Sequence, residues 1–167
     1  MAFSVAEDEL RAMDVPPLVG HLACWNYYQS IKTKDNAAFV KAFKKYCKAK
    51  GLPGGTKRVT DDPIEAAYFG VYVWKAAVEK AKSFDVDKVR TAVYGLKFDA
   101  PGGKKSMHPS NQHTLKPVYV GEILKNGQFK IVWKSDGLVT PDSYSSYLHT
   151  EGNIPKPTGG PNGDGSL

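Results

Sequence analysis

The stretch KPVYVGEILKNGQFKIVWK, residues 116–134, constrains the fold of this chain more than any other. Two runs rich in valine, isoleucine and aromatic residues flank Asn126-Gly127. Asn-Gly is the preferred pair in a two-residue hairpin turn because both residues tolerate the positive φ that such a turn requires. The spacing therefore predicts two antiparallel strands joined at this turn.

A long helix is predicted well before this hairpin, in DDPIEAAYFGVYVWKAAVEKA, residues 61–81. We expect Asp62 to cap it, with Pro63 at the first helical position and Glu65 completing the capping box. Its apolar residues recur at three and four positions and predict one buried stripe. That stripe comprises Ile64, Ala67, Tyr68, Val71, Trp74, Ala77 or Val78, and Ala81.

Shorter elements complete the expected order. Ser4 and Glu7 form a capping-box pattern that predicts a short helix to about Met13. A second helix is predicted to begin at Asp35 or Asn36 and to end at Gly51. Residues 85–94 predict a third helix. LVGHLACW, residues 18–25, has no helical period and reads as a buried strand. Helices followed by a hairpin place the chain in the α/β class. Residues 151–167 are rich in glycine and proline, and we expect them to form a disordered tail.

The segment FDAPGGKKSMHPSNQH, residues 98–113, contains features of a chemical site. Gly102-Gly103 lacks the spacing of a phosphate-binding loop and is not followed by a helix, so we interpret it as a turn between two strands. His108 and His113 are too few for a zinc site, which normally has three or four ligands. No nucleophile motif occurs either, and we predict no catalytic residue, no metal and no cofactor.

Charge and composition narrow the function classes further. The net charge of +6 is concentrated in one lysine-rich helix, residues 41–50, and only three arginines are present, which favours a solvated face over nucleic-acid binding. No apolar run is long enough to cross a membrane, and no secretion signal opens the chain. The two cysteines, Cys24 and Cys47, can form one bridge, but two separate buried thiols are expected.

An aromatic and polar cluster, Trp25-Asn26-Tyr27-Tyr28, directly follows the predicted strand. Small ligands bind just beyond strand ends in layered α/β folds, and rings with amide and hydroxyl groups suit a small polar ligand. On spacing alone, packing in the core and at its rim is the favoured interpretation of these residues, with ligand binding as the alternative.

Several segments together resemble one family, the urea or short-chain amide substrate-binding proteins of ABC transporters, in their C-terminal part. They are FSVAEDEL, PLVGHLACWNYYQSI, TDDPIEAAYFGVYVWKAAVEKA, DVDKVRTAVYGLKFDAPGG and KPVYVGEILKNGQFKIVWK. The resemblance implies a type I periplasmic-binding-protein fold, in which two α/β lobes close over a ligand. It also implies a non-enzymatic role in binding urea or a short amide, over a domain of residues 1–150.

The resemblance implies five ligand-binding residues. Glu7 matches a polar ligand-facing position, Trp25 and Tyr27 match the strand end beside the cleft, and Asp62 and Tyr68 match the entry to the long helix. An uncharged amide between rings, its hydrogens accepted by carboxylate or carbonyl oxygens, would explain selectivity at such a site.

The chain departs from the family because the N-terminal lobe and the secretion signal are absent, so the compartment stays undetermined. We expect a chain with pieces of both lobes, whose exposed sheet edges and apolar helix faces need a partner. Three explanations follow: a fragment or split half completed by another polypeptide, a repurposed subunit of a larger assembly that binds no ligand, or a self-complementing dimer.

Overall fold

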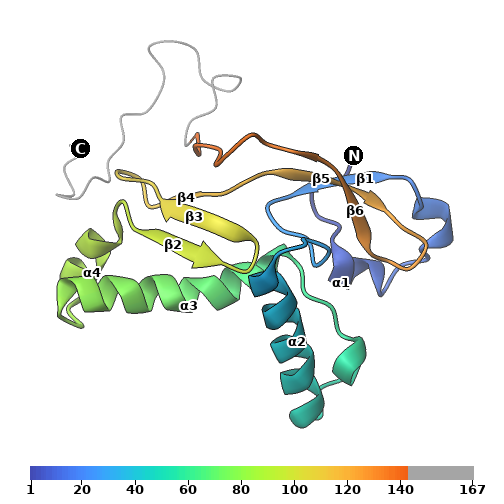
Figure 1. The fold of residues 1–167 in the computed structure, drawn as a ribbon, viewed down its shortest axis with the longest axis horizontal. Helices are drawn as coiled ribbons and strands as arrows, with labels where there is room; N and C mark the ends of the chain where they lie inside the picture. Colours follow the sequence, from blue (N-terminus) through green and yellow to red (C-terminus); the bar gives the residue numbers. More distant parts are fainter. Residues whose placement is uncertain (143–167) are drawn as a thin grey trace.

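The computed structural model describes residues 1–142, and the ribbon has two halves, each built on its own three-stranded sheet (Figure 1). The first sheet has the order β1 (Leu22–Trp25), β5 (Tyr119–Ile123) and β6 (Phe129–Lys134). The second has the order β2 (Lys97–Ala100), β3 (Gly103–Met107) and β4 (Thr114–Leu115). Every strand pair is antiparallel. The helices are α1 (Glu7–Leu10), α2 (Lys34–Ala49), α3 (Asp62–Ala81) and α4 (Val86–Val93).

The two predicted turns are confirmed. Gly127 has a φ of 72° between β5 and β6, and the Asn126 side chain accepts a hydrogen bond from Gln128 N at 3.1 Å. In the second sheet, Ala100 pairs with Gly103 across the turn between β2 and β3. Gly103 has a φ of 111°, a backbone conformation that favours glycine. Residues 98–113 therefore form a β-hairpin and the loop after it.

The predicted helices exist, but the N-terminal caps of α2 and α3 differ from expectation. Asp61, not Asp62, caps α3 by accepting a hydrogen bond from Ile64 N at 2.9 Å. Thr33 caps α2 in place of Asp35 or Asn36, because its hydroxyl accepts from the backbone of Asn36. Asp85 caps α4 as expected for a helix over residues 85–94.

The first helix is also shorter than predicted. It spans only Glu7–Leu10, and Glu9 accepts from the backbone N–H of Ala6 at 2.8 Å. Glu7, which was expected to complete a capping box with Ser4, is instead fully buried and faces the interior. The predicted strand at 18–25 begins later, at Leu22, because Pro16–Leu18 forms a 3₁₀ turn.

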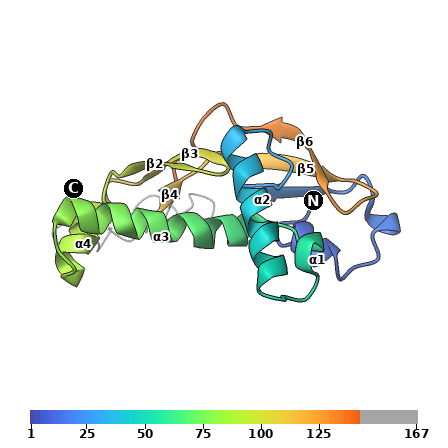
Figure 2. The ribbon, with the colours of Figure 1, turned by 60° about the horizontal axis from the view of Figure 1, so that its bottom comes forward.

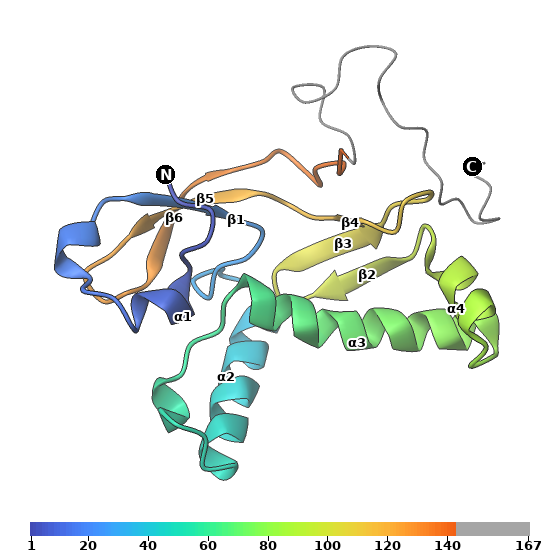
Figure 3. The same cartoon turned by 180° about the vertical axis from the view of Figure 1, so that it is seen from behind.

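Each half has its own apolar core. Under the first sheet, the ring of Tyr28 packs on Phe129 with centroids 4.7 Å apart. Along the second sheet, α3 places Phe69 and Val73 against Ala100, and Figure 2 shows this helix running beneath β2 and β3. The helix α2 projects from the region between the two halves (Figure 3).

The buried face of α3 differs from the predicted stripe. The helix buries Asp62, Glu65, Phe69, Val73 and Ala77, whereas Tyr68, Val71 and Trp74 are exposed. The helix is apolar on nearly every side, so hydrophobic spacing alone does not select the face that packs on the sheet. The sheet and the ion pair described below select it.

The two cysteines are free thiols; Cys47 is buried and Cys24 is half-buried. The predicted tail, residues 151–167, lies outside the described residues, as does the end of the predicted domain at residue 150.

Candidate functional site

A group of buried polar side chains lies where the two halves of the molecule meet, near the start of α2 and of α3 in Figure 1. We call this group the polar junction. Its buried members are Glu7, Tyr27, Asn36, Thr60, Asp61, Asp62, Glu65 and Lys105, and the half-buried Gln29 joins them. Two connecting segments pass through this region, one leading into α3 and one leading from β4 to β5. Lys116, in the second segment, lies 3.7 Å from Asp62, in the first turn of α3.

Hydrogen bonds join one side of the polar junction into a network. Tyr27 donates its hydroxyl hydrogen to Asn36 Oδ1 at 2.6 Å, and its oxygen lies 2.9 Å from Thr60 Oγ1. Gln29 continues the network, because its side-chain oxygen accepts from Thr60 N at 2.9 Å. Its own backbone N–H donates to Glu7 Oε1 at 2.7 Å. These bonds connect Glu7 to Tyr27 through residues from several segments of the chain.

An ion pair without solvent exposure forms the other side. Glu65 from α3 and Lys105 from β3 are both fully buried, and Lys105 Nζ contacts Glu65 Oε1. The same oxygen accepts from the backbone N–H of Gly102 at 3.0 Å. Lys105 Nζ also lies 4.5 Å from the centre of the Phe69 ring, a favourable cation–π contact. The pair thus joins the long helix to the turn of the second sheet.

Three carboxylate oxygens of the polar junction are buried without any hydrogen-bond partner in the described part of the chain. They are Glu7 Oε2, Asp62 Oδ1 and Glu65 Oε2. Buried polar atoms in proteins are nearly always paired, since an unpaired one costs about 1–3 kcal/mol. These three oxygens leave hydrogen-bonding capacity for a polar group in this region, and Ser30 Oγ and Arg58 Nε are likewise buried without a partner among the described residues.

Burial controls the protonation of these groups. Desolvation raises the pKa of Glu7 to about 8, so Glu7 is mainly a neutral carboxylic acid at pH 7. Desolvation also raises the pKa of Tyr27 well above its usual range, and the nearby charges of Glu7 and Glu65 add to this rise. For Lys105, burial lowers the pKa, while the charge of Glu65 works against that change. The region therefore combines acid, hydroxyl, carboxylate and ammonium groups within a desolvated interior.

The five residues singled out from the sequence do not all face one concavity. Glu7 and Tyr27 belong to one network, and Asp62 lies in the same junction. Trp25 is half-buried outside it, where its indole N–H donates to Val5 O at 2.9 Å. Tyr68 is 43% exposed and packs against Phe39 and Tyr72.

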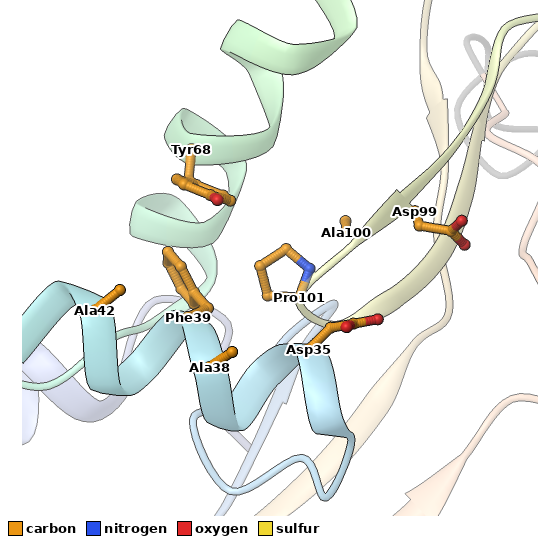
Figure 4. Close-up of a pocket in the computed structure, with 8 residues that line it drawn as sticks. All are labelled: Asp35, Ala38, Phe39, Ala42, Tyr68, Asp99, Ala100 and Pro101. Atoms are coloured by element: carbon orange, nitrogen blue, oxygen red, sulfur yellow. The ribbon is translucent and has the colours of Figure 1, made fainter.

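Tyr68 lines an open groove between α2, α3 and the β2–β3 turn, with a volume of about 370 Å³ (Figure 4). The lining residues are Asp35, Ala38, Phe39, Ala42, Tyr68, Asp99, Ala100 and Pro101. The Phe39 ring separates this groove from Tyr27, whose ring centre is 6.4 Å away. None of the three unpaired oxygens lines the groove, so the groove and the polar junction are separate candidate sites.

Sequence reasoning missed several members of the polar junction: Gln29, Asn36, Thr60 and Lys105 were not identified, and Glu65 was interpreted only as part of a cap. One signal was available for Glu65, which shares a helix face with Phe69 and Val73 at spacings of four. A charged residue on such a face needs a buried partner. No local signal identified Lys105 as that partner, because 40 residues separate the two.

The histidine pair has a structural explanation. The backbone N–H of His108 donates to the carbonyl of His113 at 2.7 Å, which closes the loop between β3 and β4. Within residues 1–142, no cluster of three or more histidine, cysteine or acidic side chains is arranged to hold a metal ion. None of the helices in the same region has the length and apolarity required to cross a membrane.

Comparison with known proteins identifies the family. Residues 1–150 match the family described as "Periplasmic binding protein domain". The chain belongs to this family. Its α/β architecture is a partial periplasmic-binding-protein-like fold, and it spans about a third of the length of the solved structures that it resembles.

Two solved structures illustrate the likeness. A solute-binding protein of an ABC transporter from Rhodopseudomonas palustris HaA2, in complex with p-hydroxybenzoic acid, is 26% identical with a TM-score of 0.61. That match covers 74% of this chain and 33% of that one. An amino acid ABC transporter substrate-binding protein from Pseudomonas fluorescens Pf-5 shares the fold with a TM-score of 0.64 at 20% identity, over 82% and 36% of the two chains.

A curated relative from Geobacillus stearothermophilus, named limonene hydroxylase, is 30% identical over 117 residues. The match covers 70% of this chain but only 20% of that protein.

Proposed function

We propose that this chain forms part of the solute receptor of an ABC transporter and binds a small uncharged amide, such as urea, without catalysis. The three unpaired carboxylate oxygens of the polar junction carry this proposal. Urea and short amides present N–H donors beside one carbonyl acceptor. Asp62 Oδ1 and Glu65 Oε2 can accept the N–H groups of such a ligand.

Glu7 supplies the complementary group. Its Oε1 accepts from Gln29, and at neutral pH the acid proton resides on the carboxyl group because the pKa is about 8. The unpaired Oε2 can then donate an O–H to the carbonyl of the ligand. Donor and acceptors together match the hydrogen-bonding pattern of an amide, which supports the choice of ligand.

The ligands of related structures differ in charge from the ligand proposed here. The structures from Rhodopseudomonas palustris hold p-hydroxybenzoic acid and benzoate, which have carboxyl groups of their own. Glu7 is mainly protonated at pH 7, and Lys105 and Lys116 are already paired with Glu65 and Asp62, so neither lysine is available to a carboxylate of the ligand. An uncharged amide needs no such counter-ion. The hydroxylase name belongs to a protein matched over a fifth of its length and supports no catalytic role.

Isothermal titration calorimetry on the natively purified protein tests the proposal. We expect saturable binding of urea or acetamide with a defined stoichiometry and no competition from benzoate. Glu7→Met removes the acid O–H together with the acceptor for Gln29, and we expect about tenfold weaker binding for the loss of about 1.4 kcal/mol, whereas Glu7→Gln keeps an N–H donor in the same place and should bind nearly as tightly.

Glu79→Met is the matched control, since Glu79 is exposed on α3 and, among the described residues, forms its ion pair with Lys75. This variant should bind urea and acetamide with the same affinity as the unmodified protein. If the folded protein gives no heat of binding with either urea or acetamide, the proposal is wrong.

A second function, an interaction subunit of a larger assembly, is favoured by a different observation. Large apolar side chains are exposed along α3 and at α4, among them Trp74, Phe84 and Val86, with Phe84 79% exposed. An exposed patch of this kind is typical of a protein interface. Native mass spectrometry of the purified particle distinguishes the two functions: a particle with other polypeptides that ignores urea would favour the subunit, and a urea-binding particle would favour the receptor.

A further inference from the structure

Building on the proposed function, we propose that Lys105 determines specificity: by neutralising Glu65, it makes the polar junction select an uncharged amide over a cation of the same shape. Guanidinium is the relevant cation, because it has the planar shape of urea with a third nitrogen in place of the oxygen. The two ligands therefore differ mainly in charge, and the charge balance of the site decides between them.

The geometry of the pair supports this role. Glu65 accepts two hydrogen bonds, one from Lys105 Nζ and one from the Gly102 N–H, and both are made to Oε1. The other oxygen, Oε2, is buried and has no partner in the described residues. Lys105 thus cancels the charge of the carboxylate while one oxygen is left able to accept an N–H from a ligand.

Close packing holds Lys105 in this position. Its ammonium lies over the Phe69 ring, and the β2–β3 turn closes directly on the pair. A Cβ atom added at Gly102 would lie 3.1 Å from both Glu65 Oε1 and Tyr27 Cδ2, and 3.5 Å from Lys105 Nζ. No side chain fits at residue 102 without movement, so the ion pair has little freedom to separate.

The charge of Lys116 also acts on Lys105, but Lys116 is already paired with Asp62 at 3.7 Å, and Asp61 caps the N-terminus of α3. Without Lys105, Glu65 would be an isolated buried carboxylate, which costs several kcal/mol unless a cation binds or a proton is taken up. A guanidinium ion would satisfy that carboxylate with planar N–H donors. The unmodified site offers it no such advantage.

Two variants test the proposal in opposite directions, with affinities measured by titration calorimetry on the full chain. Lys105→Met removes the positive charge, and the ratio of urea affinity to guanidinium affinity should fall at least about tenfold. Glu65→Gln removes the negative charge, and the ratio of acetamide affinity to acetate affinity should fall by a similar factor, since acetate matches acetamide in shape. Lys104→Met, at the exposed neighbouring lysine, is the control and should change neither ratio.

The outcomes separate this proposal from the function on which it depends. Either charge variant that is folded and keeps the unmodified ratio overturns the role of Lys105. Equal affinity of the unmodified protein for urea and guanidinium also overturns it, while leaving the amide receptor intact. If the unmodified protein binds neither urea nor acetamide, the proposed function itself is wrong.

Discussion

The apolar core under the first sheet and the polar junction are both buried, yet they differ in how completely their polar atoms are paired. In the core, the hydroxyl of Tyr28 donates to Ala23 O at 2.7 Å while its ring packs on Phe129. In the junction, three carboxylate oxygens have no partner within residues 1–142. The core is arranged for stability. The junction carries a cost in stability, which is typical of a functional site.

The largest effect is expected from breaking the buried ion pair. Glu65→Leu leaves Lys105 without its carboxylate, and we expect the free energy of unfolding to fall by about 3–5 kcal/mol. The double variant Glu65→Leu with Lys105→Met replaces both charges by apolar side chains and should recover most of this loss. Differential scanning calorimetry measures the stability of the single and the double variant. A single variant as stable as the unmodified protein would show that the pair does not hold α3 on the sheet.

A smaller effect is expected from pH, through Glu7. Its pKa is raised from 4.5 to about 8 by burial, so the folded state retains a proton that the unfolded state releases. The contribution of Glu7 is therefore most favourable below about pH 4.5 and is lost as the pH rises towards 8.

At about 1.4 kcal/mol per pH unit, the unmodified protein should lose about 3 kcal/mol between about pH 5 and pH 7 relative to Glu7→Gln. Thermal unfolding of both proteins across this range checks the difference, in which the contributions of other titrating groups largely cancel. A constant difference would mean that Glu7 is ionised in the folded protein.

The smallest effect concerns the apolar core, where packing rather than charge is tested. A Cβ at Gly121 would lie 2.7 Å from Tyr28 Cζ and 2.9 Å from Phe129 Cδ1. Gly121→Ala should therefore destabilise the protein by about 1–3 kcal/mol, because both rings must move.

Gly70→Ala is the matched control: Gly70 lies in α3 with no atom within 4 Å of an added Cβ. That variant should gain about 0.5–1 kcal/mol from helix propensity. Equal melting temperatures for the two alanine variants would contradict the packing described for the first sheet.

Local signals in the sequence predicted the secondary structure well. The hairpin at Asn126-Gly127, the turn at Gly102-Gly103 and the capped helix after Asp85 are all present, since each depends on residues adjacent in the chain. The cap of α3 lies one residue before the predicted one, and the cap of α2 two or three residues before, because several residues that can cap a helix stand close together at both helix starts. Of the five residues predicted to bind a ligand, Glu7, Tyr27 and Asp62 lie in the polar junction, whereas Trp25 and Tyr68 do not.

The sequence by itself determined the α/β class, the order of the elements and the positions of the turns, because backbone preferences and short-range spacing decide these. Only the tertiary structure decided which face of α3 is buried and which charges meet. Glu65 and Lys105 are 40 residues apart, and no local pattern identifies one as the partner of the other. Their pairing depends on the second sheet folding back along α3, where exclusion of water makes an isolated charge costly and so selects the opposite charge as its neighbour.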